Sequence, residues 1–212
     1  MLAIPAILEK DFSKAKAKIV KLSPFFSRFQ IDIADGVAVP NKTLESKDFK
    51  TKDFPNLSFD FHLMVKDPEK ELEALEEKPN VNLAFIDFQS AREAFFNPSY
   101  PFEIGITLNP EDKPDELAQK NFFKSIDHVL IMTVNPGFQG SPFLPEMLSK
   151  IKRLRKLGFK KKIYLDGGIN DKTIKKILPY KNEIFGLCIG SYLTRLPADK
   201  IQKSLLKLKQ QF

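Results

Sequence analysis

Eight short apolar runs, spaced along a chain of 212 residues, limit its fold more than any other feature of the sequence. Each run has the length and the mainly apolar character of a strand that is buried on both faces. Most are separated by segments with helical spacing, for example Phe12, Ala15, Ile19 and Leu22. Strands and helices that alternate in this way predict parallel pairing, with the helices covering the sheet. The runs span residues 2–7, 29–34, 59–65, 83–88, 103–108, 128–134, 162–165 and 184–189.

The number of strand–helix units predicts how the sheet is arranged. Eight units in a chain of this length fit a closed (β/α)8 barrel, the TIM barrel, so we expect residues 1–212 to form a single domain of the α/β class. An open doubly wound sheet is the alternative. The segments near residues 90–100 and 111–125 contain prolines and are poor helices, so these two units are the weakest part of the count.

Basic residues outnumber acidic ones, with 34 Lys and Arg against 27 Asp and Glu, which gives a formal net charge of +7. Most are lysines in helix-like stretches such as residues 14–21 and 150–156, without interleaved aromatic residues or a recognised nucleic-acid motif. This pattern is more typical of the solvated outer faces of helices than of a nucleic-acid site. We therefore expect no nucleic-acid partner, although a positive surface would attract a phosphorylated metabolite.

The sequence carries little sign of export or of a membrane. Its one cysteine, Cys188, lies in an apolar run, which predicts a buried core residue and excludes an intramolecular disulfide. The apolar residues at the amino terminus meet charged residues directly after Leu8, without the basic start and the length of a signal peptide. No run approaches the ~18 apolar residues of a membrane helix. We expect a cytoplasmic protein that does not associate with membranes.

Polar side chains interrupt the apolar runs near the carboxyl ends of the strands, where a parallel barrel carries its chemistry. Asp32 lies between two isoleucines and shares a strand face with Gln30, His62 lies in the third run, and Asp166 follows the seventh. Burying an isolated carboxylate is unfavourable, so such a group is normally paired, bound to a metal or catalytic. A structural role for Asp32, as the partner of a lysine or as a loop cap, is the alternative. Two strand-end aspartates and a strand histidine together favour a functional site.

Glycine-bearing loops follow the last three predicted strands. Glycine allows backbone N–H groups to approach and surround an anion, and barrels commonly hold a phosphate in this region. One glycine pair alone would more often be a turn, but loops after three consecutive strands predict a phosphate site. The glycines are Gly137 and Gly140 after the sixth strand, Gly167 and Gly168 after the seventh, and Gly190, which precedes Ser191, after the eighth.

Several stretches match one known family and occur in the family's order. They are Pro5-Ala-Ile-Leu8, Asp32-Ile-Ala-Asp35-Gly36 with Val39-Pro40-Asn41, His62-Leu-Met-Val65, Leu130-Ile-Met-Thr-Val-Asn-Pro-Gly-Phe138 and Asp166-Gly-Gly168. On these residues the chain resembles the ribulose-phosphate 3-epimerase family, barrels of the ribulose-phosphate-binding type that invert C3 of a ketopentose phosphate. The stretches that begin at Leu130 and at His62 are the most specific.

The resemblance implies a mechanism for the strand-end carboxylates. Asp32 and Asp166 would form an acid/base pair on opposite sides of the substrate. One removes the C3 proton and the other returns a proton to the opposite face, with an enediolate between the two steps. One divalent metal ion, Zn, Mn, Fe or Co, would stabilise the enediolate. The family's metal ligands fall on Gln30, Asp32, His62 and Asp166.

The resemblance also implies a substrate and its contacts. The family converts D-ribulose 5-phosphate to D-xylulose 5-phosphate, so the expected partner is a small-molecule sugar phosphate. Members of the family often associate, which extends the expectation to a homo-oligomer. The implied substrate-binding residues include two methionines that line the cavity; the set is Ala6, Met64, Met132, Asn135, Gly137, Phe138, Gln139, Gly140, Gly167, Gly168, Gly190 and Ser191.

A few positions depart from the family pattern. Gln30 stands where the family has a metal-binding histidine, Ala6 where it usually has serine, and Ala34 where it has a further cavity methionine. An amide oxygen is a poorer donor for zinc than an imidazole. The fourth strand also lacks the histidine often found there. Two alternatives follow: a pocket enlarged by the two alanines that acts on a ketohexose 6-phosphate, or a catalytically silent barrel that binds a phosphorylated ligand. The Asp-x-Lys-x-x-Asp signature of related decarboxylase barrels is absent.

Overall fold

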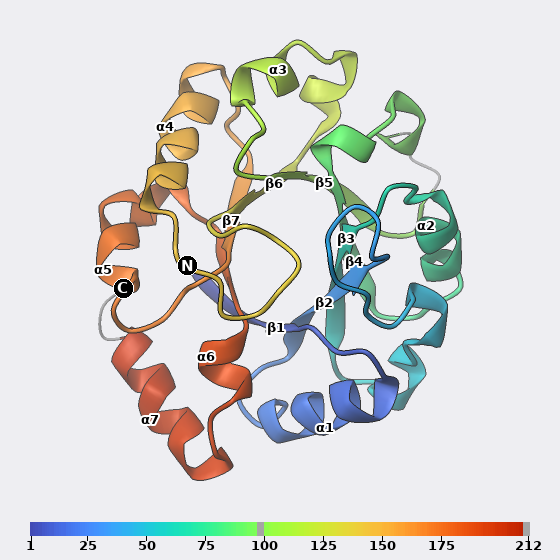
Figure 1. The fold of residues 1–212 in the computed structure, drawn as a ribbon, viewed down its shortest axis with the longest axis vertical. Coiled ribbons are helices and arrows are strands. Elements are labelled where there is room, and N and C mark those ends of the chain that lie inside the picture. Colours follow the sequence, from blue (N-terminus) through green and yellow to red (C-terminus); the bar gives the residue numbers. More distant parts are fainter. Residues whose placement is uncertain (97–99, 210–212) are drawn as a thin grey trace.

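Eight parallel strands close into a barrel in the computed structural model, which describes residues 1–96 and 100–209 (Figure 1). Each strand pairs with the next in chain order, and β8 pairs with β1, so the sheet has no free edge. This confirms the predicted (β/α)8 barrel and excludes the open sheet. Every strand begins and ends within two residues of its predicted run. The strands are β1 (Leu2–Ile7), β2 (Arg28–Ala34), β3 (Ser58–Met64), β4 (Val81–Asp87), β5 (Glu103–Leu108), β6 (His128–Met132), β7 (Lys162–Asp166) and β8 (Gly186–Ile189).

Helices lie outside the ring between most of the strands (Figure 1). The helical spacing from Phe12 to Leu22 is confirmed by α1, which begins where the Asp11 carboxylate accepts a hydrogen bond of 2.9 Å from the Lys14 backbone N–H. Three apolar side chains of α1 face the barrel and are buried. The helices are α1 (Phe12–Leu22), α2 (Glu69–Glu76), α3 (Pro114–Ala118), α4 (Ser149–Lys156), α5 (Ile174–Ile177), α6 (Ser191–Thr194) and α7 (Ala198–Lys209).

The two segments predicted to be poor helices contain little helix. The connection from β5 to β6 holds the five-residue α3 and the 3-10 turn η5 (Asn121–Ser125). The connection from β4 to β5 holds the 3-10 turns η3 (Phe88–Ser90) and η4 (Glu93–Phe96), and residues 97–99 lie outside the described part of the chain. Strands β5 and β6, which follow these two connections, nevertheless pair with their neighbours. The barrel therefore closes without full helices in the two connections.

The connection from β2 to β3 replaces a covering helix with a cluster of aromatic rings. Two 3-10 turns, η1 (Ser46–Asp48) and η2 (Thr51–Asp53), hold the buried Phe49 ring between them. Edge-to-face and offset ring contacts of this kind add to the stabilisation from apolar burial. The centroid of the Phe49 ring lies 5.1 Å from Phe59, 5.5 Å from Phe12, 5.7 Å from Phe61 and 6.4 Å from Phe54.

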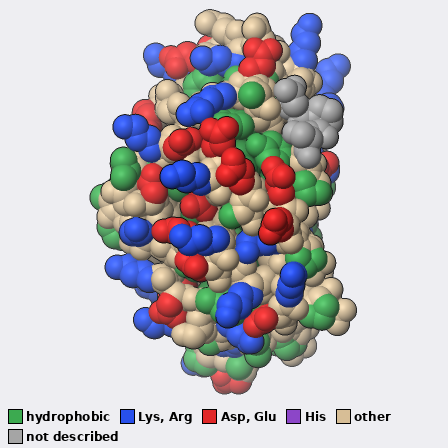
Figure 2. All heavy atoms as spheres, turned by 90° about the vertical axis from the view of Figure 1, so that its right-hand side faces the viewer, with side chains coloured by type: hydrophobic (Ala, Val, Ile, Leu, Met, Phe, Trp, Pro, Cys, Tyr) green, Lys and Arg blue, Asp and Glu red, His purple; other side chains and the backbone are tan. Residues whose placement is uncertain are grey.

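Apolar side chains fill both sides of the barrel wall. Cys188 belongs to the cluster inside the barrel, where its free thiol is buried as predicted. The larger cluster lies between the strands and the outer elements. On the face on the side of α2, Lys and Arg side chains are interspersed with Asp and Glu side chains (Figure 2). None of the helices in the described ranges has the length and apolar character needed to cross a bilayer.

Candidate active site

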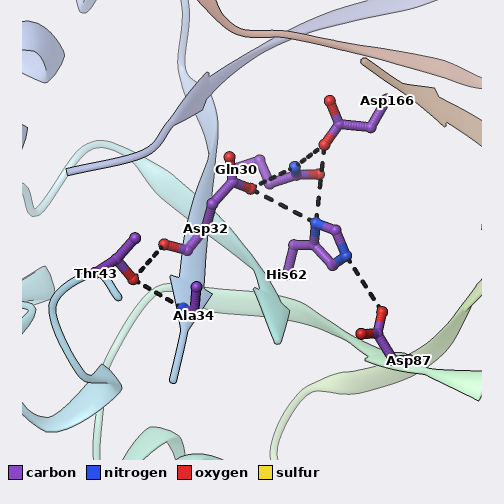
Figure 3. A network of polar contacts seen from close by, with 7 residues as sticks. All are labelled: Gln30, Asp32, Ala34, Thr43, His62, Asp87 and Asp166. Carbon is purple, nitrogen blue, oxygen red and sulfur yellow. Dashed lines mark hydrogen bonds and ion pairs between the residues drawn. The ribbon is translucent and has the colours of Figure 1, made fainter. Parts of the chain in front are cut away.

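Three acid and imidazole side chains meet inside the barrel mouth. Asp32 at the end of β2, His62 on β3 and Asp166 at the end of β7 each offer a ligand atom, and these atoms lie within 4.8 Å of one another. The barrel register explains the meeting, because Asp32 lies directly opposite His62 in the β2–β3 pair. All three are buried, with exposed fractions of 7%, 1% and 7%. The predicted cluster is therefore brought together at the expected end of the strands (Figure 3).

Gln30 links the two carboxylates of this cluster. Its amide nitrogen donates hydrogen bonds of 2.8 Å to Asp32 Oδ1 and 2.5 Å to Asp166 Oδ2 (Figure 3). Its amide oxygen is buried without a hydrogen-bond partner. A neutral N–H donor between two carboxylates reduces their mutual repulsion. Gln30, a predicted metal ligand, thus points its amide nitrogen toward the carboxylates. Rotation of the amide group by 180° would point its oxygen toward them instead.

The imidazole of His62 lies between three carboxylates. Its Nδ1 is 3.7 Å from Asp32 Oδ1 and 3.9 Å from Asp166 Oδ2, and its Nε2 is 3.7 Å from Asp87 Oδ1. These distances are too long for hydrogen bonds, and neither ring nitrogen has a hydrogen-bond partner. Burial opposes the charged imidazolium, but the interactions with Asp32 and Asp87 outweigh it and raise the pKa of His62 to about 10.

Asp166 holds its proton more tightly than an ordinary aspartate does. Burial, followed by the negative charge of Asp32, raises the pKa of Asp166 from its usual range to about 7. The hydrogen bond from Gln30 and the charge of His62 oppose this shift only in part. A carboxyl group with a pKa raised toward neutral can donate a proton in an acid/base reaction.

The donor set fits a divalent cation. Two carboxylates and the unpartnered His62 Nδ1 converge on one point, and the Gln30 oxygen is a further buried acceptor without a partner. Carboxylate oxygen and imidazole nitrogen together suit zinc, manganese, iron and cobalt. Because unpartnered buried polar atoms are unfavourable, a bound cation would satisfy atoms that the protein itself leaves unpaired.

A cavity opens above the cluster. Asp32, His62 and Asp166 form part of its wall, while Gln30 lies behind them and is not in the lining. Of the predicted substrate contacts, Asn135 is exposed and also lies outside the lining. The predicted contacts that do line the cavity are Ala6, Met64, Met132, Gly137, Phe138, Gln139, Gly140, Gly167, Gly168, Gly190 and Ser191.

The expectation that two alanines enlarge the pocket holds for only one of them. Ala6 lines the cavity, but Ala34 does not, because it packs against Val39, Met64 and Leu8 in a small apolar cluster. The space that a larger side chain at position 34 would take is thus partly occupied. The enlargement that motivates a hexose phosphate substrate depends on Ala6 alone.

The loop after β7 needs glycine for steric reasons. Gly167 has φ +110°, and a Cβ there would lie 2.4 Å from the Val134 side chain. Gly168 has φ +65°, and its Cβ would lie 3.0 Å from Phe143. Both positions thus bring the backbone close to the loop after β6, whose residues also line the cavity. The predicted glycine loops therefore surround one cavity, as a phosphate site requires.

Three residues that sequence reasoning missed support the site. Thr43 Oγ1 donates to the Asp32 carbonyl at 3.0 Å and accepts from the Ala34 N–H at 2.8 Å, which fixes the end of β2 (Figure 3). Asn41 donates from its side chain to the Gly137 carbonyl at 2.7 Å and joins the β2 and β6 loops. The third is Asp87, the last residue of the buried strand β4. A carboxylate at the end of an apolar strand could have been recognised in the sequence as a candidate site residue.

Comparison with known proteins gives the family. The model of the family described as "Ribulose-phosphate 3 epimerase family" matches residues 2–193. The chain belongs to the ribulose-phosphate 3-epimerase family. The ribulose-phosphate 3-epimerase of Treponema pallidum is 30% identical over 186 residues, which cover 82% of this chain and 83% of the relative. The enzyme of the same name from Bacillus subtilis is 28% identical over 185 residues, covering 82% and 84%.

Solved structures agree with the fold of this epimerase family member. A phosphoribosyl anthranilate isomerase from Thermus thermophilus superposes with a TM-score of 0.66 at 15% identity, covering 99% of each chain. A 3-hexulose-6-phosphate synthase superposes with a TM-score of 0.64 at 14% identity, covering 100% of each chain. At this identity the likeness establishes the barrel fold alone.

Proposed function

We propose that the protein inverts C3 of a ketose phosphate and converts D-ribulose 5-phosphate to D-xylulose 5-phosphate. The observation that carries the proposal is the pair of buried carboxyl groups, Asp32 and Asp166, in the wall of one cavity that glycine loops surround. Membership of the ribulose-phosphate 3-epimerase family supports the same reaction. The proposed ligand is a small sugar phosphate, and we propose no nucleic-acid partner.

In this reaction the residues of the chain bind the sugar and move protons. The backbone N–H groups of the glycine loops anchor the phosphate. Asp32 removes the C3 proton from one face, and Asp166 delivers a proton from its carboxyl to the other face. The pKa of about 7 allows Asp166 to hold that proton at neutral pH. In the reverse direction the two aspartates exchange their tasks.

The cluster would hold one divalent cation, zinc, manganese, iron or cobalt, through Asp32, His62 and Asp166, with Gln30 as a further oxygen ligand after rotation of its amide. When bound, the cation supplies positive charge that acidifies the C3 hydrogen and stabilises the enediolate. Met64 and Met132 give the cavity apolar walls that keep water from the reacting carbon.

The test is direct. The purified protein is supplied with D-ribulose 5-phosphate and, in separate reactions, with manganese, cobalt, zinc or iron(II), and xylulose 5-phosphate is measured. We expect turnover with at least one of these cations. Folded protein that produces no xylulose 5-phosphate under any of these conditions would eliminate the reaction.

Two other functions each have one observation in their favour. The Gln30 amide nitrogen donates to both carboxylates at a position where the family has a metal-binding histidine, which favours a silent barrel that binds a phosphorylated ligand. Ala6 leaves room in the cavity, which favours a ketohexose 6-phosphate. Binding of a phosphate ester without any C3 hydrogen exchange would support the silent barrel, and a higher kcat/KM on the hexose phosphate would support the larger substrate.

Replacing Gln30 with histidine is expected to raise the affinity for zinc by about tenfold or more. Imidazole is a better donor for zinc than an amide oxygen, and the change also removes the N–H group that faces the carboxylates. Competition with a chromophoric chelator measures the affinity. Gln119→His, which adds a histidine on an exposed residue at the end of α3 outside the barrel, is the control and should leave the affinity unchanged. An unchanged zinc affinity in Gln30→His would show that position 30 does not contribute to the metal site, and a weaker one would contradict the expected gain from the imidazole.

A further inference from the structure

Asp87 is a buried carboxylate that takes no place in the mechanism above. It ends β4, is 5% exposed, and does not belong to the cavity lining. Its Oδ1 has no hydrogen-bond partner. A buried carboxylate oxygen that lacks a partner is unfavourable and needs an explanation. The group opposite that oxygen is the Nε2 of His62, at 3.7 Å.

The two nitrogens of the His62 ring face different partners. Nδ1 points toward Asp32 and Asp166, while Nε2 points away from them toward Asp87 (Figure 3). Within residues 1–96 and 100–209, Asp87 makes the one ion-pair contact to Nε2. An imidazole offers a lone pair from one nitrogen only while the other carries the hydrogen, and the partner of that N–H group sets the ring orientation.

We propose that Asp87 is a positioning residue: its carboxylate accepts the Nε2–H of His62 and holds the ring with Nδ1 toward the Asp32–Asp166 pair. The present distance exceeds an ordinary hydrogen bond by roughly 0.8 Å, which a small rotation of either side chain closes. This hydrogen bond gives a partner to both Asp87 Oδ1 and His62 Nε2, which otherwise lack one. It also prevents the ring from turning over, which would take Nδ1 away from the site.

The proposal predicts a specific signal from the metal-free protein. The chain has two histidines, so a 15N–1H spectrum of the imidazole groups is simple, and His128→Gln identifies the His62 signals. We expect a downfield, slowly exchanging Nε2–H signal for His62. Asp87→Ala should abolish it, and Asp87→Asn, which keeps an acceptor oxygen but loses the charge, should keep it and move it upfield.

A matched control separates positioning from general loss of a buried acid. Asp112 is 2% exposed and follows β5, but its carboxylate accepts hydrogen bonds from Gln89 and from the Asn109 backbone N–H instead of facing His62. Asp112→Ala should leave the His62 signal as in the unsubstituted protein. Affinity for manganese, measured by competition with a chelator, should fall about 10-fold to 100-fold in Asp87→Ala, as for other partners of metal-binding histidines.

The His62 signal decides the proposal without substrate or turnover. An identical Nε2–H signal in the unsubstituted protein and in Asp87→Ala would overturn it. If Asp87→Ala does not fold, an unchanged chemical shift in Asp87→Asn would overturn it equally. The manganese measurement rests on the proposed function, whereas the spectrum of the metal-free protein does not. Failure of the epimerase reaction and failure of the Asp87 role are therefore distinguishable.

Discussion

Asp32→Asn is expected to lower the rate of C3 hydrogen exchange by about 10²-fold to 10⁴-fold, because positioned acid and base groups contribute that much to proton transfer. Asparagine has nearly the same shape and can still accept the hydrogen bond that Gln30 donates at 2.8 Å. It cannot remove a proton. Incorporation of solvent deuterium at C3 of D-ribulose 5-phosphate, followed by NMR, measures the rate.

Asp112→Asn is the control for this prediction, because Asp112 is equally buried but lies outside the cavity lining. It should exchange hydrogen at nearly the unsubstituted rate. An Asp32→Asn protein that exchanges as fast as the unsubstituted protein would remove Asp32 from the reaction. Loss of exchange in the control as well would point to a general loss of structure.

Phe49→Ala is expected to lower the free energy of unfolding by about 3–5 kcal/mol, the usual effect of removing a fully buried aromatic ring. Phe49 has no exposed surface and contacts four other phenylalanine rings. Since the β2–β3 connection has no helix, this ring carries much of the contact between the connection and the barrel. Urea unfolding followed by circular dichroism measures the change.

Phe25→Ala serves as the comparison, because its side chain is 38% exposed. We expect it to lower the free energy of unfolding by about 1 kcal/mol or less. A similarly small effect of Phe49→Ala would show that the aromatic cluster is not what holds the β2–β3 connection against the barrel.

The strands were predictable from sequence because both of their faces are buried. A run such as residues 184–189 is apolar throughout, as is typical of a covered parallel strand. The β2–β3 connection was not predictable in the same way. Its phenylalanines have no helical period, and they form a cluster only because turns η1 and η2 direct them toward rings on α1 and β3.

The candidate cluster of acid and imidazole groups was predictable for a different reason. Polar residues at the ends of apolar strands must meet at one mouth of a parallel barrel, so Asp32, His62 and Asp166 could be grouped without coordinates. The direction of the Gln30 amide could not, because it depends on two carboxylates that face each other across the barrel. The contact between Asp87 and His62 likewise depends on how β3 and β4 pair.

The closed ring also has a consequence for the newly made chain. Gln30 and Asp166 are 136 positions apart, so an emerging polypeptide contains β1 to β6 well before β7 can complete the acidic cluster. Such distant pairings form late, because closing a long loop costs entropy before any contact stabilises it. On the ribosome, capture of a cation at this cluster would therefore report that β7 has joined the earlier strands, before β8 pairs with β1 and closes the ring.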